Sequence, residues 1–217
     1  MNVELARFNM IEQQIRPWEV LDGGVLALLG LMRREDFVPP AYRALAFVDC
    51  EVPLPEGQAM LAPRVEARLL QEAHVYRHET VLEIGAGSGF MAALLAHKAR
   101  SVLSLEIRPA LVKMAQDNLR RAGIANATVR LGDGVAGLPS QAPFDAILLS
   151  GSVAAVPQAL LDQLKPGGRL LAITGAEPVM QAVRVTRQAE HSFATQTLFD
   201  TMAPRLDGFG EPSTFHF

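Results

Sequence analysis

The feature that most constrains this chain is an apolar run that ends in three alternating glycines, Val81-Leu82-Glu83-Ile84-Gly85-Ala86-Gly87-Ser88-Gly89-Phe90. The run predicts a buried strand, a tight turn and the start of a helix, because glycine lacks a Cβ and lets the backbone bend sharply. The amides that open the helix would then point at a ligand lying against the turn. The alternative is a helix packed closely on a strand with no ligand.

The spacing of these glycines favours one kind of ligand. It is Gly-x-Gly-x-Gly, whereas the dinucleotide fingerprint is Gly-x-Gly-x-x-Gly and has its third glycine where this chain has Phe90. Glu83 lies at the end of the strand, directly before the turn. A carboxylate there suits a cationic ligand better than a pyrophosphate. S-adenosylmethionine, which carries a sulfonium and an ammonium group, is such a ligand.

Strand-like and helix-like segments alternate from about Thr80 onward. The expected strands are short and mostly apolar, as buried parallel strands are: residues 80–84, 101–106, 128–131, 145–150 and 169–174. The expected helices are residues 88–99, 109–122 and 157–164. This alternation predicts an α/β fold with a Rossmann-like, doubly wound, mostly parallel sheet. We expect a further helix after Gly175 and one or two strands within residues 193–217.

The first 75 residues have a different pattern. Helices are expected near residues 2–16 and 23–33, followed by a proline-punctuated segment over 38–63. The stretch Val52-Pro53-Leu54-Pro55-Glu56-Gly57 excludes a regular helix or a central strand. We therefore expect a single domain over residues 1–217, with an N-terminal, substrate-facing cap (1–75) over the ligand edge of an S-adenosylmethionine-binding α/β core (76–217).

Composition narrows the classes of function. The 217 residues carry a net charge of -3, so we do not expect a broad basic surface of the kind that binds nucleic acid. The one cysteine excludes an internal disulfide and a cysteine-rich zinc site. We see neither a secretory signal nor an apolar run of roughly 18 residues that would span a membrane, so we expect a cytoplasmic protein. The histidines do not form a close metal-binding set: His74, His78, His97, His191 and His216.

Polar residues at the ends of the expected strands strengthen the ligand hypothesis, because ligands of open α/β sheets bind beyond the carboxyl ends of the strands. Glu106 follows the turn by about 20 residues, the usual place for an acid that accepts hydrogen bonds from a ribose diol. Ile107 could then lie against a purine face, and Asp133 could accept from an adenine amino group. Ser150 ends the fourth strand. Each acid alone could be a solvated strand-end charge, but their order along the sheet is the one that S-adenosylmethionine recognition requires.

These residues resemble the protein-L-isoaspartate O-methyltransferases. The glycine run is similar to that family's Glu-Ile-Gly-Thr-Gly-Ser-Gly-Tyr pattern. Further similar stretches are Gly132-Asp133-Gly134, Ala142-Pro143-Phe144-Asp145, Gln163-Leu164-Lys165-Pro166-Gly167-Gly168-Arg169, Arg34-Glu35-Asp36-Phe37-Val38-Pro39 and Ala46-Phe47-Val48-Asp49. The resemblance spans roughly residues 10–175, including the cap, and implies the class I methyltransferase fold.

The resemblance also implies an activity. Such proteins transfer a methyl group from S-adenosylmethionine to the α-carboxylate of isoaspartyl residues in damaged proteins or peptides, and S-adenosylhomocysteine is the product. The residues expected to hold the cofactor are Glu83, Gly85, Ala86, Gly87, Ser88, Gly89, Glu106, Ile107, Asp133, Gly134 and Ser150.

One departure affects the substrate side. The family carries Gln-Thr-Ile-Ser before its Gln/Ala-Pro, and that serine faces the reacting carboxylate; this chain reads Gln58-Ala59-Met60-Leu61-Ala62-Pro63. Leu61 can neither donate nor accept a hydrogen bond through its side chain. The substrate-facing candidates are Gln58, Met60 and Leu61, and Arg16 or Arg64 could orient a carboxylate instead of the serine.

Three hypotheses follow from the sequence. The first is an isoaspartyl-type O-methyltransferase. The second is a family member that binds S-adenosylmethionine but has lost its activity or methylates another acceptor. The third is a nicotinamide-dependent oxidoreductase, which the glycine spacing and Glu83 disfavour. The sequence predicts no metal site and does not specify an oligomeric state.

Overall fold

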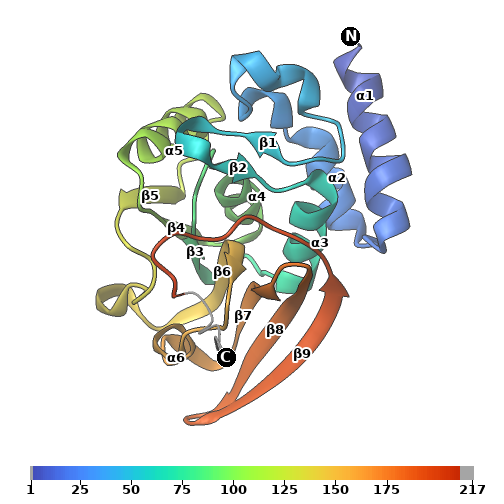
Figure 1. Ribbon diagram of the computed structural model, residues 1–217. Helices are drawn as coiled ribbons and strands as arrows, with labels where there is room; N and C mark the ends of the chain where they lie inside the picture. The colour runs from blue at the N-terminus through green and yellow to red at the C-terminus, as the bar shows by residue number, and fades with distance from the viewer. Residues whose placement is uncertain (1, 211–217) are drawn as a thin grey trace, which may run out of the picture.

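A seven-stranded sheet organises the fold (Figure 1). The computed structural model describes residues 2–210. The strand order is β5-β4-β3-β6-β7-β8-β9. Strands β3 to β7 run parallel, and β8 and β9 continue the sheet antiparallel. The bounds are β3 (Thr80–Ile84), β4 (Ser101–Glu106), β5 (Ala127–Leu131), β6 (Phe144–Val153), β7 (Leu164–Ala176), β8 (Val179–Ala189) and β9 (Ser192–Asp200). The predicted α/β class and the mostly parallel sheet are confirmed.

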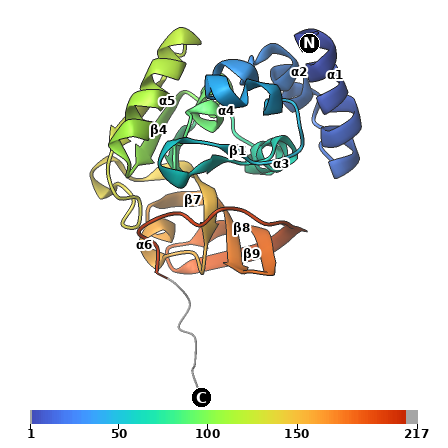
Figure 2. The ribbon, with the colours of Figure 1, turned by 45° about the horizontal axis from the view of Figure 1, so that its top comes forward.

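Helices cover the two faces of the sheet unequally (Figure 2). One face carries α3 (Pro63–Ala73), α4 (Phe90–Lys98) and α5 (Pro109–Arg121), with α2 (Gly23–Leu31) packed on α3 and α4. The other face carries the short α6 (Gln158–Leu161), which contacts β7. Side chains alternate accordingly: in β3, Val81 belongs to the larger helix-side core, whereas Leu82 and Ile84 belong to the core on the α6 side. Burial on both faces explains why the parallel strands read as continuous apolar runs.

The predicted helices of the core are present but shorter than expected. The helix expected over 88–99 is α4, which begins at Phe90 because Gly89 adopts a left-handed conformation. The helix expected over 157–164 ends at Leu161, and β7 already pairs with β6 at Leu164. The pairing then resumes at Arg169, so the glycine turn at 165–168 is a bulge within the strand. The order of these helices and turns was therefore predicted correctly, whereas the lengths of the helices and the start of β7 were not.

The prediction of a helix after Gly175 is wrong. The chain turns back there and forms β8, antiparallel to β7. Met180 and Ala182 enter the helix-side core, whereas Val183 and Val185 enter the core on the α6 side. Burial on alternating faces, together with the β-branched Val183 and Val185, is typical of a strand. The prediction of a helix relied instead on the alternation of strands and helices in the preceding chain. β9 confirms a strand after residue 193, and residues 211–217 lie outside the described part of the chain.

The N-terminal segment is helical at first and irregular afterwards. α1 (Val3–Met10) continues into a π-helical turn (Ile11–Ile15) and a 3-10 turn (Arg16–Trp18), where a helix was expected over 2–16. The proline-rich stretch forms only a two-residue pair, β1 (Val52–Pro53) with β2 (Ala59–Met60). Among the described residues no helix is both long and apolar enough to cross a membrane.

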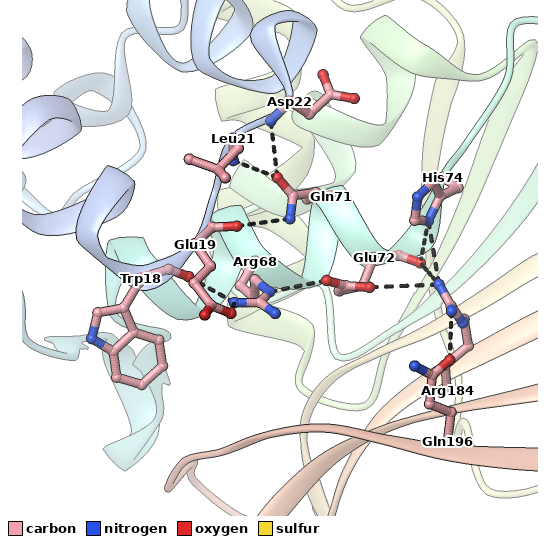
Figure 3. A network of polar contacts seen from close by, with 10 residues as sticks. All are labelled: Trp18, Glu19, Leu21, Asp22, Arg68, Gln71, Glu72, His74, Arg184 and Gln196. Atoms are coloured by element: carbon pink, nitrogen blue, oxygen red, sulfur yellow. Dashed lines mark hydrogen bonds and ion pairs between the residues drawn. The ribbon is translucent and has the colours of Figure 1, made fainter.

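Helix α3 ties the N-terminal segment to the sheet through polar side chains (Figure 3). Arg68 donates to the carbonyl of Trp18 over 2.8 Å and pairs with Glu72 over 3.0 Å. Gln71 accepts from the amides of Leu21 and Asp22. On the other side Arg184 of β8 donates to the carbonyl of Glu72 and to Gln196 of β9. The helix thereby links residues 18–22 of the N-terminal segment to β8 at the antiparallel end of the sheet.

A buried ion pair fixes the entry to β3. Arg169 of β7 donates to both carboxylate oxygens of Glu79 over 2.6 Å, and also to the carbonyls of Ala73 and His74 at the end of α3. Bidentate geometry with full satisfaction of the guanidinium is the arrangement in which a buried pair is tolerated. The pair therefore couples α3, β3 and β7.

Replacing Arg169 by alanine is expected to lower the free energy of unfolding by about 3–5 kcal/mol, because Glu79 would stay buried without its counter-charge. Urea denaturation of the wild type and the variant measures the loss. Lys113→Ala, which removes the exposed partner of Asp117, is the control and should have little measurable effect. A loss below about 1 kcal/mol in the Arg169 variant would contradict this account.

Candidate active site

The glycine turn has the predicted geometry. Gly85, Gly87 and Gly89 have φ values of +87°, +52° and +82°. Residues with a Cβ rarely adopt this left-handed region, so glycine is required at all three positions. The amide of Gly85 donates to the carbonyl of Leu105 over 2.9 Å, which anchors the turn to the end of β4. The turn thus opens a space between the ends of β3 and β4.

Two of the predicted glycine-turn residues take part in packing against α5, and one of them, Gly89, does not line the cavity. A Cβ on Gly89 would lie 3.1 Å from the backbone of Ala115, so this glycine allows α4 to pack closely on α5. The carbonyl of Ser88 accepts from the side chain of Asn118, also on α5. Two adjoining pockets that share Gly85, Gly87 and Ser150 lie beyond the strand ends and are together called the cavity here. Gly85, Ala86, Gly87 and Ser88 line it, and Gly89 does not.

Glu83 is fully buried below this cavity. Its two carboxylate oxygens accept from Ser104 over 2.5 Å and from Ser150 over 2.8 Å. Burial raises the pKa of Glu83 to about 7, although the two hydroxyl donors lower it, and the neighbouring Glu106 and Glu66 raise it further. Among the described residues, the groups that shift this pKa include no lysine or arginine. A buried carboxylate without a counter-cation beside a cavity is a site for a cationic ligand.

Glu106 and Ile107 lie at the end of β4 as predicted. The carboxylate of Glu106 accepts from the amide of Gly87 over 2.9 Å and from the amide of Arg108 over 3.0 Å. It is nearly buried and lines the cavity, and the half-exposed Ile107 lines it too. The acid is therefore held rigidly by the two loops that border the space.

Of the two predicted residues after β5, one lines the cavity and the other forms a hydrogen bond within its own loop. Gly134 lines the cavity, and a Cβ there would overlap the side chain of Ile84, so a larger residue would displace that side chain. Asp133 does not line the cavity: one of its oxygens accepts from the amide of Val135 over 2.9 Å. The role of Asp133 toward an adenine amino group therefore stays a prediction.

The N-terminal segment brings its three predicted substrate-facing residues to the same space. Gln58 lines the end of the cavity near Glu106, while Met60 and Leu61 line the end near Glu83, where both are buried. Neither predicted arginine lines it: Arg16 pairs with the partly exposed Glu12, four residues earlier in the chain. Arg64 pairs with Asp49 and stacks on Trp18, with its guanidinium carbon 4.2 Å from the ring centroid.

Sequence reasoning missed an acid on α3 that also lines the Glu83 end of the cavity. Glu66 is buried and pairs with Arg34, which also donates to the carbonyl of Leu61 over 2.8 Å. Burial raises the pKa of Glu66 to about 7 despite the arginine. Only the helical spacing of α3 could have signalled it, since Glu66 falls on the apolar face of that helix. Leu206, Asp207 and Phe209, which line the cavity, and Arg108, which pairs with Asp207, were also missed.

The described residues contain no group of three or more His, Cys, Asp or Glu side chains placed to hold a metal ion.

Comparison with known proteins shows the family to which the chain belongs. A sequence model described as protein-L-isoaspartate (D-aspartate) O-methyltransferase matches residues 7–203. The chain belongs to this family. It is 39% identical over 182 residues to the protein-L-isoaspartate O-methyltransferase of Methanoculleus marisnigri, covering 84% of this chain and 83% of that one. It is 36% identical to that of Brucella anthropi, covering 95% of each.

Two solved structures share the fold. A protein-L-isoaspartate O-methyltransferase superposes with a TM-score of 0.80 at 23% identity, covering 93% of this chain and 66% of that one. A Plasmodium falciparum protein of this kind, solved in complex with S-adenosyl-L-homocysteine, superposes with a TM-score of 0.79 at 19% identity and covers 95% and 99%. The class I methyltransferase fold and the family prediction are confirmed, and the oxidoreductase alternative has no support. This is an S-adenosylmethionine-dependent methyltransferase family.

The burial of Glu83 predicts a pH-dependent stability. Its pKa is raised in the folded state, so the folded protein binds more protons than the unfolded one between about pH 4.5 and 7. Stability is therefore fully present below this window and is lost as the pH rises through it. Between pH 5 and 8 the wild type should lose on the order of 2–3 kcal/mol relative to Glu83→Gln.

Denaturant unfolding of both proteins at pH 5, 6.5 and 8 measures this difference. Glu190→Gln, at an exposed glutamate, is the control and should show the same pH dependence as the wild type. Parallel curves for the wild type and Glu83→Gln would show that Glu83 is not held protonated by burial.

Proposed function

We propose that this chain methylates the free carboxylate of isoaspartyl residues in proteins or peptides, with S-adenosylmethionine bound along the cavity at the ends of β3, β4 and β5. The observation that carries the proposal is Glu83, a fully buried carboxylate at the cavity with a pKa near 7 and no arginine or lysine among the groups that shift it. A ligand with an ammonium and a sulfonium group supplies the missing cation.

The remaining residues fit the nucleoside part of the same ligand. Glu106, held by the amides of Gly87 and Arg108, presents a carboxylate for a ribose diol. Ile107, which lines the cavity, offers an apolar surface for the purine. Asp133, between the cavity-lining Gly132 and Gly134, would supply an acceptor for its amino group. A charge-assisted hydrogen bond of this kind contributes roughly 1.5–3 kcal/mol. The family's cofactor chemistry, donation of an electrophilic methyl group, needs nothing further from these side chains than binding and orientation.

The acceptor end of the site is apolar. Met60 and Leu61 wall the cavity beside Glu83. By the sequence resemblance, Leu61 corresponds to the serine of the family's Gln-Thr-Ile-Ser stretch. A substrate carboxylate is already ionised at neutral pH, so the reaction requires no general base. A dry pocket favours the neutralisation of an anion by a cation, and positioning supplies much of the barrier reduction. Because the side chain of Leu61 cannot orient the carboxylate, this chain should act slowly on isoaspartyl peptides.

The proposal further includes a cytoplasmic location and no nucleic-acid partner, consistent with the small net charge of -3. A single cap-and-core domain over residues 1–217 is part of the same proposal. Isothermal titration with S-adenosylmethionine, S-adenosylhomocysteine and NAD tests the cofactor: the first two should bind and NAD should not.

Transfer of labelled methyl to an isoaspartyl peptide tests the activity, with the aspartyl peptide of the same sequence as the control substrate. Leu61→Ser should raise kcat/KM roughly tenfold, because a hydroxyl can hydrogen-bond the carboxylate. Leu61→Ala removes the same bulk without adding a hydroxyl and should give no such gain. Equal gains in both variants would mean that space, rather than the hydroxyl, limits the reaction. Methyl transfer to neither peptide would overturn the proposed acceptor.

A further inference from the structure

Helix α3 places an acid in the cavity beside the apolar acceptor wall. Glu66 is only 4% exposed, and it lines the same end of the cavity as Leu61 and Glu83. Burying a carboxylate is unfavourable unless its charge is compensated. Packing gives no reason for an acid here, because the other buried residues of α3 are apolar: Pro63, Val65, Ala67, Leu69, Leu70 and Ala73.

Glu66 uses only one of its two carboxylate oxygens within the protein. Oε2 accepts from Arg34, which also donates to the carbonyl of Leu61 over 2.8 Å. The guanidinium carbon of Arg34 lies 4.9 Å from the centroid of the Phe90 ring. Oε1 of Glu66 accepts no hydrogen bond from the residues that the structure describes. Because Glu66 lines the cavity, this oxygen is available to a ligand there.

This end of the cavity offers no positive charge to an anionic acceptor. Among the described residues, the charged side chains that line it are both acids, Glu83 and Glu66. Arg34 is 1% exposed and does not line it. In the proposed function Glu83 binds the cationic groups of the cofactor, so Glu66 remains for the acceptor. At short range Glu66 repels an acceptor carboxylate unless a positive charge lies between them.

One form of the proposed substrate carries that positive charge. An isoaspartyl residue within a chain has its α-carboxylate next to an uncharged amide. At the amino terminus of a peptide, the same carboxylate shares its carbon atom with an α-ammonium group. The reference pKa of an α-amino group is about 7.7–8.0, so this group is mostly protonated at neutral pH. A hydrogen bond between an ammonium group and a carboxylate is short and strong.

We propose that Glu66 binds the α-ammonium group of an isoaspartyl residue at the amino terminus of a peptide, so that such termini are the preferred methyl acceptors of this chain. The inference rests on the proposed function. Oε1 of Glu66 holds the ammonium group and thereby fixes the reacting carboxylate on the same carbon atom. This contact supplies the orientation that the side chain of Leu61 cannot give. Arg34 is a positioning residue, because it binds both Glu66 and the carbonyl of Leu61.

The methyl transfer needs no proton from Glu66. An oxygen of the α-carboxylate forms a bond to the methyl carbon as the bond from that carbon to the sulfonium sulfur breaks. The electron pair of the broken bond stays on sulfur. The products are the α-methyl ester and S-adenosylhomocysteine. The ammonium group keeps its proton throughout, so Glu66 binds and orients the acceptor only.

Three peptides test the proposal in the wild-type protein. The first has an amino-terminal isoaspartyl residue, the second is its acetylated form, and in the third a hydroxyl group replaces the α-ammonium group. In labelled methyl transfer the first should have a kcat/KM about tenfold above the other two, mainly through a lower KM, because they lack one charge-assisted hydrogen bond. The hydroxyl analogue controls for the bulk of the acetyl group. Equal kcat/KM for all three would overturn the inference.

Two variants assign the preference to Glu66. Glu66→Gln keeps an oxygen that can accept from Arg34, and it should remove the preference for the unmodified terminus. Its kcat/KM on the acetylated peptide should stay within about twofold of the wild type. Glu72→Gln is the matched control, because Glu72 is an acid of the same helix that pairs with Arg68 and does not line the cavity. This control should keep the preference.

The affinity for S-adenosylhomocysteine separates the acceptor from the cofactor. Its Kd, measured by calorimetry, should change less than about threefold in Glu66→Gln. A rise of about tenfold would assign Glu66 to the cofactor and overturn the inference. Equal losses on the unmodified and acetylated peptides would show a structural role and would also overturn it. Should Glu66→Gln fail to fold, the comparison of the three peptides in the wild type still decides. If the wild type methylates no isoaspartyl peptide, the proposed function itself is wrong.

Discussion

The buried carboxylate of Glu83 is the interaction on which the site depends. It lies at the centre of the sheet, between β4 and β6, and each neighbouring strand contributes one serine hydroxyl to it. Two neutral donors make the burial of an acid tolerable without neutralising its charge. The protein thus buries an acid without a counter-charge at the point where a cationic ligand can supply that charge. The glycine turn, the rigid Glu106 and the apolar cap are arranged around that point.

The core of the fold was predictable because its signals are local. Apolar runs bounded by glycine and charge specify β3 to β7, and the strand-end positions of Glu83, Glu106 and Ser150 follow from the parallel topology. The glycine turn could be predicted in detail, since only glycine adopts its left-handed conformations readily. The role of Gly89 could not, because its close neighbour Ala115 is known only once α5 is packed on α4.

The parts that escaped prediction depend on contacts that are distant in sequence. β8 was expected as a helix since the preceding chain alternates strands and helices, yet its residues bury alternately on two faces. Arg64 appeared free to orient a substrate, and the structure pairs it with Asp49 and Trp18. Leu206 and Asp207 carry no motif, and only the return of the chain across the sheet edge places them at the cofactor cavity.

The most direct test of the central claim is the number of protons released when S-adenosylhomocysteine binds, obtained from calorimetric titrations in buffers of different ionisation enthalpy. With a pKa near 7, Glu83 is largely protonated at pH 6.5 before binding, and a bound ammonium group favours its ionised form. The account predicts release of roughly half to one proton at pH 6.5 from the wild type and none from Glu83→Gln. Binding without proton release in the wild type, or equal release in both proteins, would contradict it.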